Sequence, residues 1–274
     1  MEATSFHAPG SGEAAERDEV VAPVFDRTVE EGVRRLNRTW PGLLATGWVG
    51  GMDVGVGVMA LALVKESTGS EALGALAFGI GFIALTLASS ELFTENFLVP
   101  IAAIVAGRGG IAQLVKLWVG TLVMNLIGGW VFMGIVATGL PQLHKALLEL
   151  GEHFVSIGLG SQALAAAVLG GGIITLMTWM QNGTEAEMPQ LVAAVSAAFL
   201  LAIGSLNHAI VMSLEMFAAL EIGAPFGYLA WVKAFGIACA GNIVGGVGFV
   251  TLLRMIQVGR AKIAQEREAA ASEN

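Results

Sequence analysis

Long apolar runs separated by short polar segments dominate the chain from residue 40 to residue 258. A helix rises about 1.5 Å per residue, so about 20 apolar residues cross a bilayer. Four runs are long enough to do so without interruption, at 40–64, 111–138, 160–180 and 229–257. Two more stop at polar residues and then continue, at 71–89 with 97–106 and at 188–203 with 209–220. The pattern predicts an all-α membrane protein with six transmembrane helices, two of them broken.

The two interruptions carry the polar residues of the apolar region, SSELFTENF at 89–97 and SLNHA at 205–209. Backbone that leaves a helix at membrane depth persists only where protein or water satisfies its polar groups. Each break therefore predicts a cavity. Half-helices that begin near Phe97 and Ala209 would direct their partly positive N-termini toward it, which favours a small anion.

The two halves of the chain resemble each other. MNLIGG at 124–129 matches GNIVGG at 241–246, 117 positions later, and the break at Thr94 matches the break at His208, 114 positions later. Because each half contains three predicted transmembrane helices, the second half must be inverted across the membrane relative to the first. An inverted 3+3 repeat is common in transport proteins, where it places a site near the middle of the bilayer.

The polar ends complete the predicted organisation. Residues 1–23 are expected to form a disordered tail, 24–39 an amphipathic surface helix, 40–258 the channel domain and 259–274 a C-terminal tail. With the N-terminus inside, eleven Lys and Arg residues lie in inner segments and three in outer ones. This asymmetry predicts a multi-pass protein of an inner membrane with both termini in the cytoplasm.

Composition excludes several classes of function. Of the 274 residues 55% are hydrophobic and 13% are charged, against about 25% charged in soluble domains. No sizeable aqueous domain remains outside the spans, and the net charge of −8 argues against nucleic-acid binding. The one cysteine, Cys239, and four scattered histidines form no metal motif, and no phosphate-binding loop occurs. We expect no cofactor and no enzymatic activity.

The stretch ELFTENFLVPIAAIVAGRGGIAQLVKLWVGTLVMNLIGG resembles the signature region of the formate/nitrite transporter family, in which a (D/E)LFTxN motif precedes a basic linker and a further helix. LNHAIVM at 206–212 resembles the second break of the family, and GNIVGG resembles its last span. The resemblance covers about residues 24–258. It implies a homopentamer of aquaporin-like protomers in a lipid bilayer, each passing small monovalent anions such as formate, nitrite or hydrosulfide.

The resemblance also implies roles for individual residues. The central pore site would consist of Thr94, Asn207 and His208, with Thr94 hydrogen-bonding toward the histidine. The remaining roles follow from position in the family pattern: a first break loop of Glu91, Leu92, Phe93, Glu95 and Asn96, a pore constriction of Phe78, Phe82, Phe93 and Leu201, and support of the breaks by Asn125 and Asn242.

Three positions depart from the family pattern. Glu95 replaces a small residue, Asn207 replaces an acidic residue that often precedes the histidine, and a lysine before the fourth span has no counterpart. Lys145 and His153 are the nearest cations. We therefore expect the pore to attract external anions less strongly than related pores do.

The residues themselves leave two readings open at most sites. His208 either donates a proton to an anion held between apolar constrictions or is a neutral bridge between backbone groups. Thr94 either orients His208 or caps the helix that follows. Asp53, in the middle of the first span, either makes a helix-packing hydrogen bond or acts in selectivity or proton transfer, since a charge there costs about 2.5–3.5 kcal/mol.

The other carboxylates are also ambiguous. Glu91 and Asn96 are expected to satisfy loose backbone groups of the break. Glu95 is either a solvated charge facing the cytoplasmic vestibule or a determinant of selectivity. Glu215 lies seven residues after His208, about 10 Å along the same helix face. It either lies on the route from the histidine to the outside or is an end-of-helix carboxylate near headgroups.

The sequence thus predicts a channel or proton-coupled transporter for small monovalent anions or their weak acids, with protonation at His208. One alternative is a neutral-solute pore of the aquaporin type, although the chain has no NPA pair. A second is a non-transporting membrane protein whose segments 1–22 and 254–271 dock a soluble partner.

Overall fold

The computed structural model describes residues 11–272, and this part of the chain is helical with no strand. The first half contains α1 (Ser11–Leu36), α2 (Trp40–Thr68), α3 (Glu71–Ala88), a 3-10 turn η1 (Phe93–Phe97), α4 (Val99–Val105) and α5 (Ile111–Gly139). The second half contains η2 (Pro141–Leu143), α6 (His144–Ser156), α7 (Ser161–Asn182), α8 (Glu187–Ile203), α9 (Ala209–Glu221), α10 (Tyr228–Ile243), the π-helix η3 (Val244–Thr251), α11 (Leu252–Val258) and α12 (Arg260–Ser272).

Five helical stretches of the described chain are long and apolar enough to cross a membrane: Trp40–Thr68, Glu71–Ala88, Ile111–Gly139, Ser161–Asn182 and Tyr228–Val258. Two shorter apolar stretches, Phe93–Val105 and Glu187–Ile203, lie within the same bundle. The expectation of an all-helical protein with several apolar helices is confirmed.

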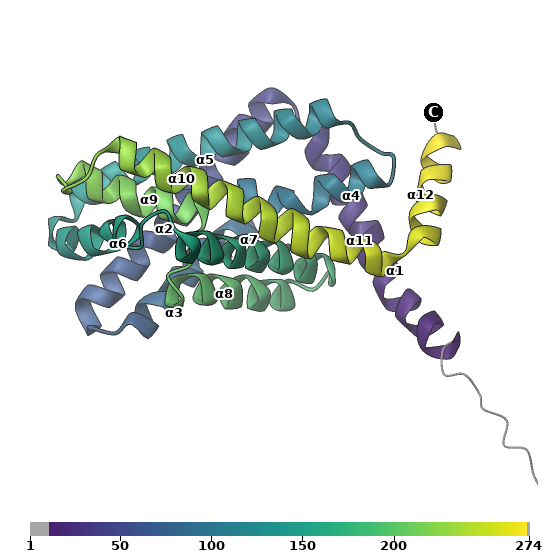
Figure 1. Cartoon of the computed structure of the whole chain (residues 1–274), viewed down its shortest axis with the longest axis horizontal. Coiled ribbons are helices and arrows are strands. Elements are labelled where there is room, and N and C mark those ends of the chain that lie inside the picture. Colours follow the sequence, from purple (N-terminus) through teal and green to yellow (C-terminus); the bar gives the residue numbers. More distant parts are fainter. Residues whose placement is uncertain (1–10, 273–274) are drawn as a thin grey trace, which may run out of the picture.

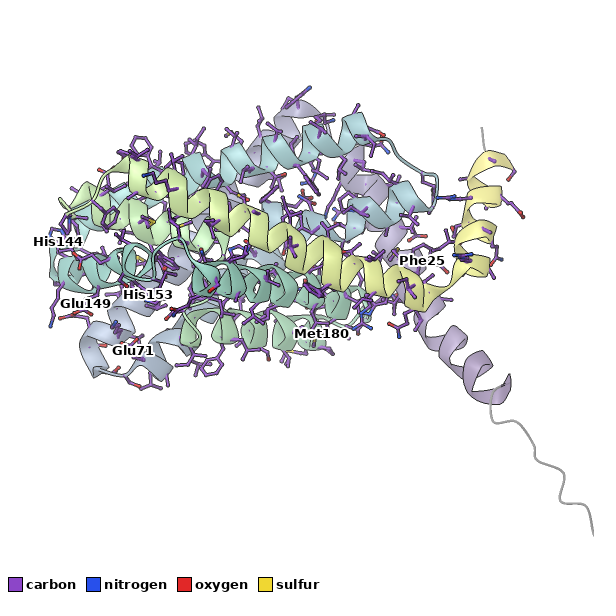
Figure 2. The ribbon with its side chains drawn as sticks, in the orientation of Figure 1. Phe25, Glu71, His144, Glu149, His153 and Met180 are labelled. Atoms are coloured by element: carbon purple, nitrogen blue, oxygen red, sulfur yellow. The ribbon has the colours of Figure 1, made fainter. Side chains whose placement is uncertain are left out.

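The long helices run side by side along the long axis of Figure 1, and the terminal elements lie at one end of them. There α1 and α12 cross the end of the bundle, and Lys262 of α12 pairs with Asp26 of α1 at 2.7 Å. The helix α6 lies at the opposite end. We call these two ends the α1 end and the α6 end. Figure 2 shows Phe25 at the first, and Glu71, Glu149 and His153 at the second.

The polar segments contain more helix than the sequence pattern indicated. The helix α1 begins at Ser11, within the segment 1–23 that was expected to be a tail, and residues 1–10 lie outside the described part. The sequence pattern also missed α6, whose buried side includes Ala146, Leu147 and Phe154. These apolar positions recur at helical spacing over only 13 residues, too few for the length criterion used to find spans.

Glycine allows the long helices to approach closely. A Cβ atom at Gly51 of α2 would overlap the backbone carbonyl of Asn125 on α5. A Cβ at Gly171 of α7 would overlap the carbonyl of Asn242 on α10. In lipid, where burying apolar side chains between helices gains little, small residues at such contacts permit close packing. These contacts bring both asparagines next to the two chain breaks.

Candidate functional site

The helices before the two interruptions, α3 and α8, end in similar ways. Ser89 directly follows α3 with φ of 54°, and Ser205 lies two residues after the end of α8 with φ of 44°, so both serines adopt the left-handed conformation that stops a helix. The chain then crosses the interior of the bundle before α4 and α9 begin. It is at these two crossings that the polar residues identified from the sequence lie.

The first crossing is fixed by a reciprocal pair of bonds. The Leu92 amide donates to the Glu95 carboxylate at 3.1 Å, and the Glu95 amide donates to the Leu92 carbonyl at 3.2 Å. This closes the turn η1 and directs the Thr94 side chain into the protein. In the second crossing His208 is the N-cap of α9, because its Nδ1 accepts from the Val211 amide at 3.3 Å.

Thr94 and His208 meet at the centre of the bundle. Thr94 Oγ1 lies 2.7 Å from His208 Nε2, and both side chains have 0% exposure. Because Nδ1 accepts a hydrogen bond, a neutral ring must carry its hydrogen on Nε2, which then donates to Thr94 Oγ1. The threonine hydroxyl hydrogen is therefore free to donate to a third group. Thr94 makes no capping bond to α4, whose N-cap is Leu98.

Asn125 and Asn242 make matching bonds at the two crossings. The side-chain oxygen of Asn125 accepts from the Phe93 amide at 2.9 Å, and its Nδ2 donates to the carbonyls of Gly47 and Glu91. The side-chain oxygen of Asn242 accepts from the Ala209 amide at 2.9 Å, and its Nδ2 donates to the carbonyls of Ala167 and Asn207. Each side-chain amide thus satisfies two backbone groups at a crossing and ties that crossing to a carbonyl of a neighbouring helix, Gly47 in α2 or Ala167 in α7.

The four residues expected at the constriction, Phe78, Phe82, Phe93 and Leu201, are all buried within one apolar cluster. The rings of Phe78 and Phe82 lie 5.6 Å apart between centroids. The Phe93 ring packs edge-on against Phe97 and against Trp118 of α5. We call this apolar cluster around the Thr94–His208 pair the plug.

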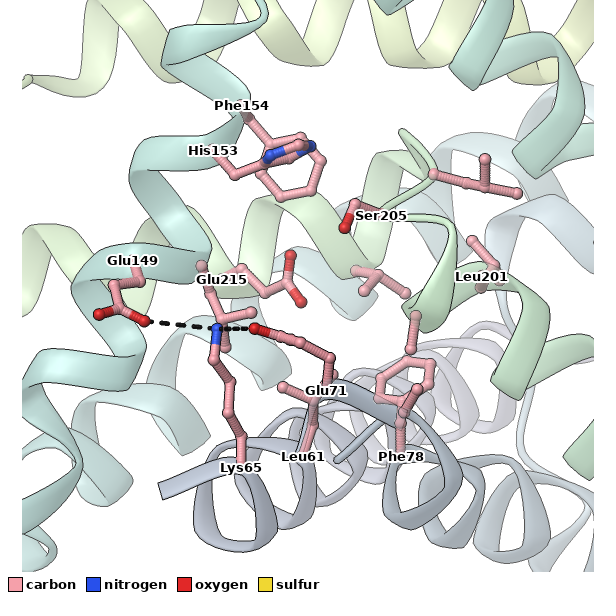
Figure 3. A pocket seen from close by; sticks show the side chains of 15 residues that line it. Leu61, Lys65, Glu71, Phe78, Glu149, His153, Phe154, Leu201, Ser205 and Glu215 are labelled. Carbon is pink, nitrogen blue, oxygen red and sulfur yellow. Dashed lines mark ion pairs between the residues drawn. The ribbon is translucent and has the colours of Figure 1, made fainter. Parts of the chain in front are cut away.

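A cavity of about 210 Å³ lies on the α6 side of the plug. Phe78, Leu201 and Val211 line it, and polar side chains from α2, α3, α6, α9 and the second crossing converge on it (Figure 3). These side chains are Lys65, Glu71, Glu149, His153, Ser205 and Glu215. The Lys65 ammonium pairs with Glu71 at 2.9 Å and with Glu149 at 3.4 Å.

A second cavity of about 200 Å³ lies on the α1 side. Its lining is almost wholly polar and comes from α1, α3, the first crossing, α7 and α8: Glu31, Arg34, Arg35, Leu85, Thr86, Ser89, Ser90, Glu95, Thr178, Gln181, Asn182 and Gln190. Two polar cavities are thus separated by an apolar plug that contains one hydroxyl–imidazole pair.

An arginine whose side chain is 11% exposed holds α1 against the first crossing. The Arg35 guanidinium bonds Glu31 at 2.6 Å and Asn96 at 3.1 Å, and it lies 3.5 Å from Glu91 and 3.7 Å from Glu95. Burial raises the pKa of the Glu31 carboxyl, but the guanidiniums of Arg35 and Arg34 outweigh this effect and hold the pKa below its usual value.

This arrangement corrects two expectations about the first break. Glu91 does not accept from loop amides, because its carboxylate faces Arg35 and lies 2.8 Å from Arg38. Glu95 is not a solvated charge, since it is 6% exposed and its carboxylate accepts from an amide of the loop. The structure thus gives Glu95 the backbone-supporting contact that was expected of Glu91.

Three further candidates lie away from the Thr94–His208 pair. Asp53 accepts a hydrogen bond from Ser90 beside the first crossing. The Asn207 side chain is buried and donates to the Ala163 carbonyl of α7 at 3.4 Å. Glu215 is 6% exposed and lines the α6-end cavity.

Sequence reasoning missed Lys65 and the two arginines. Lys65 lies near the end of the first span, where a lysine usually extends toward lipid headgroups. Only the folded structure shows that its side chain lines a cavity. Arg35 and Arg38 lie in a charged amphipathic segment, whose solvent face is the usual place for such residues. The one feature of the sequence that pointed to these ion pairs was the presence of two carboxylates, Glu91 and Glu95, in the first break loop.

Within the described residues, no group of three or more His, Cys, Asp and Glu side chains could hold a metal ion. The geometry instead suits a solute small enough to pass between two polar cavities and able to form hydrogen bonds in the plug. A charged solute meets a large desolvation cost there unless its charge is removed.

Most of the chain is similar to one family of membrane transport proteins. The family model described as formate/nitrite transporter matches residues 22–256. The inner membrane protein YfdC of Escherichia coli (strain K12) is 25% identical over 261 residues, which cover 90% of this chain and 82% of that protein. The formate channel BtFdhC of Bacillus thuringiensis is 25% identical over 247 residues, covering 83% of this chain and 91% of that one.

Two solved structures share the fold. An FNT family ion channel superposes with a TM-score of 0.75 at 16% sequence identity, covering 85% of this chain and 98% of the other. A pentameric formate channel with formate bound superposes with a TM-score of 0.64 at 18% identity, covering 79% of this chain and 96% of the other. At these identities the superpositions establish the arrangement of helices.

Proposed function

The chain belongs to the formate/nitrite transporter family, and we propose that it carries formate, or a similarly small monovalent anion, across a membrane as the neutral acid. Members of this family are channels and transporters, so the protein is a transport protein and not an enzyme. The observation that carries the proposal is the position of Thr94 and His208 in an apolar plug between two polar cavities.

The mechanism follows from the cost of moving charge. An anion in the plug would lose its hydration without a cation to replace it, whereas the neutral acid loses far less. In the proposed step His208 takes up a proton and transfers it from a ring nitrogen to an oxygen of the anion. The Thr94 hydroxyl, which accepts a hydrogen bond from the neutral histidine, keeps its proton and donates a hydrogen bond to the solute. His208 is then neutral and ready to be protonated again.

The architecture proposed for this pathway has six spans: α2, α3 with α4, α5, α7, α8 with α9, and α10 with α11. The matching bonds of Asn125 and Asn242, and the positions of α1 and α6 at opposite ends of the bundle, support an inverted repeat. The lysine and arginine distribution supports a cytoplasmic α1 end.

We also propose a homopentamer with one pore in each protomer. The shared fold with a channel that is itself pentameric supports this assembly. Large apolar side chains such as Leu229, Ile135 and Ile256 are more than half exposed in the single chain, as expected of surfaces that face lipid or other protomers. Chemical cross-linking in the native membrane would reveal the number of chains.

Transport by the purified protein in liposomes tests the proposal. Formate, nitrite, hydrosulfide, acetate and glycerol are offered between pH 5 and 8, with protein-free liposomes as the control. We expect formate flux above that control, rising as the pH falls. Flux of glycerol without pH dependence would instead support a neutral-solute pore, and no flux of any solute with correctly inserted protein would favour a non-transporting role.

A further inference from the structure

We propose that Lys65 and Glu215 form an anion-binding site in the α6-end cavity, which takes a small carboxylate such as formate when Glu215 is protonated and repels it when Glu215 is charged. The inference rests on the proposed function, because it names the place where the transported anion first binds on that side of the plug. Neither residue touches the Thr94–His208 pair, so the site is separate from the central one.

Glu215 differs from the other carboxylates of the cavity. Its side chain is 6% exposed and points from α9 into the open space between Lys65 and Ser205 (Figure 3). Within the described chain it makes no hydrogen bond and no ion pair. Glu71 and Glu149 both pair with Lys65, and their side chains are 70% and 48% exposed. Glu215 is therefore a buried group that faces a cavity without a partner.

Lys65 supplies the positive charge of the proposed site. Among the side chains that line this cavity, all within the described chain, it is the one lysine or arginine. An ammonium group has three N–H donors. Two of them face the exposed carboxylates of Glu71 and Glu149, which leaves one for a ligand. A ligand held by this donor would lie beside the Glu215 carboxyl group.

The protonation of Glu215 then decides what the site can bind. A protonated carboxyl group donates one hydrogen bond, so together with Lys65 it offers two donors to a carboxylate ligand. A charged Glu215 has no donor and adds a third negative charge to those of Glu71 and Glu149. The other titratable group facing the site is His153 on α6. Anion binding in this cavity should therefore require acid.

The position of the site connects it to the pathway. Glu215 lies four residues, about 6 Å along α9, after Val211. Val211 lines the same cavity, and its amide donates to His208 Nδ1. Phe78 and Leu201 of the plug also line the cavity. An anion released from Lys65 and Glu215 would next meet the plug and His208.

The test measures formate uptake into liposomes at a series of concentrations, at pH 5 and at pH 8, for the wild type and for Glu215→Gln. Glutamine has the shape of the protonated acid and keeps an N–H donor at every pH. We expect the half-saturating concentration of the wild type to be at least about twofold higher at pH 8 than at pH 5, since Glu215 loses its donor in the fraction of molecules in which it is charged. Glu215→Gln should remove most of that difference by improving binding at pH 8.

This outcome is a gain at pH 8, which general damage to the fold would not produce. Glu149→Gln and His153→Gln serve as matched controls in the same cavity, and both should keep the pH dependence of the wild type. A Glu215→Gln protein with the pH dependence of the wild type would overturn the inference while leaving the proposed function intact. Absence of formate flux in the wild type would overturn both.

Lys65→Met provides a second measurement that does not depend on how Glu215→Gln folds. Removing the ammonium should raise the half-saturating formate concentration about tenfold at pH 5. An unchanged value for correctly inserted Lys65→Met would overturn the inference.

Discussion

The Thr94 hydroxyl and the His208 imidazole lie 2.7 Å apart, although 114 residues separate them in the sequence. Each comes from a non-helical crossing, and each crossing is held by one asparagine. The polar pair is therefore a product of both halves of the chain, and neither half could build it alone. Its burial makes it a structural contact that also offers a hydroxyl and an imidazole to a solute within the plug.

Replacing Thr94 by valine tests the contribution of the hydroxyl. Valine keeps the branched shape but leaves the His208 N–H without an acceptor, and it removes the donor proposed for the solute. We expect formate flux into liposomes at pH 6 to fall by about tenfold or more, the scale of one lost buried polar contact of about 1–3 kcal/mol. Thr94→Ser should keep at least half of the flux. Equal losses in both variants would contradict the role given to the hydroxyl.

The two asparagines should contribute similarly to stability. Asn125→Leu and Asn242→Leu each remove bonds to two backbone groups at a crossing and to one helix carbonyl, and each unsatisfied buried group at a crossing costs about 1–3 kcal/mol. We expect both variants to unfold at clearly lower temperature in detergent, by comparable amounts. The exposed Asn37→Leu variant is the control. A large loss for one variant and none for the other would contradict equivalent roles.

Arg35 should hold α1 in place. Arg35→Met leaves Glu31, Glu91 and Glu95 without their shared cation, and removing one partner of a buried ion pair costs about 3–5 kcal/mol. Amide hydrogen exchange in residues 24–36 should accelerate strongly. Arg34→Met is the matched control, because Arg34 is exposed and pairs with Glu31 alone. Similar exchange in the two variants would refute a special role for Arg35.

The plug should limit the size of the transported solute. Phe78→Ala removes a fully buried ring that lines the α6-end cavity and packs on Phe82. We expect the flux of acetate relative to formate to increase several-fold, because acetate is larger than formate by one methyl group and a pocket that excludes one such group discriminates on the order of tenfold or more. Phe249→Ala, on an exposed face of the bundle, should leave the ratio unchanged. An unchanged ratio in Phe78→Ala would place the constriction elsewhere.

Hydrophobic periodicity and resemblance predicted much of the bundle. The apolar runs correspond to helices in the structure, and the interruptions at 89–97 and 205–209 lie where helices end. Such features are local, because the length of an apolar run and a change to polar residues depend on neighbours in sequence. The pairing of Thr94 with His208 needed the family resemblance, since no local pattern connects residues so far apart.

The charged contacts could not be predicted in the same way. Glu91 and Glu95 lie four positions apart with similar surroundings in the sequence, yet one faces two arginines and the other accepts from a backbone amide. Which carboxylate takes which partner depends on where α1 crosses the bundle. Lys65 likewise acquires its surroundings from α3 and α6, and the sequence analysis had not identified α6.

Formate flux into liposomes from pH 8 to pH 5, compared between the wild type and His208→Asn, tests the central claim most directly. Asparagine can still bond to Thr94 but cannot carry a proton. We expect wild-type flux to rise as the pH falls. The variant should show no such rise, and its flux at pH 5 should be about tenfold or more below that of the wild type, since a general acid contributes at least that factor. A His208→Asn protein with the rate and pH profile of the wild type would contradict proton transfer at this histidine.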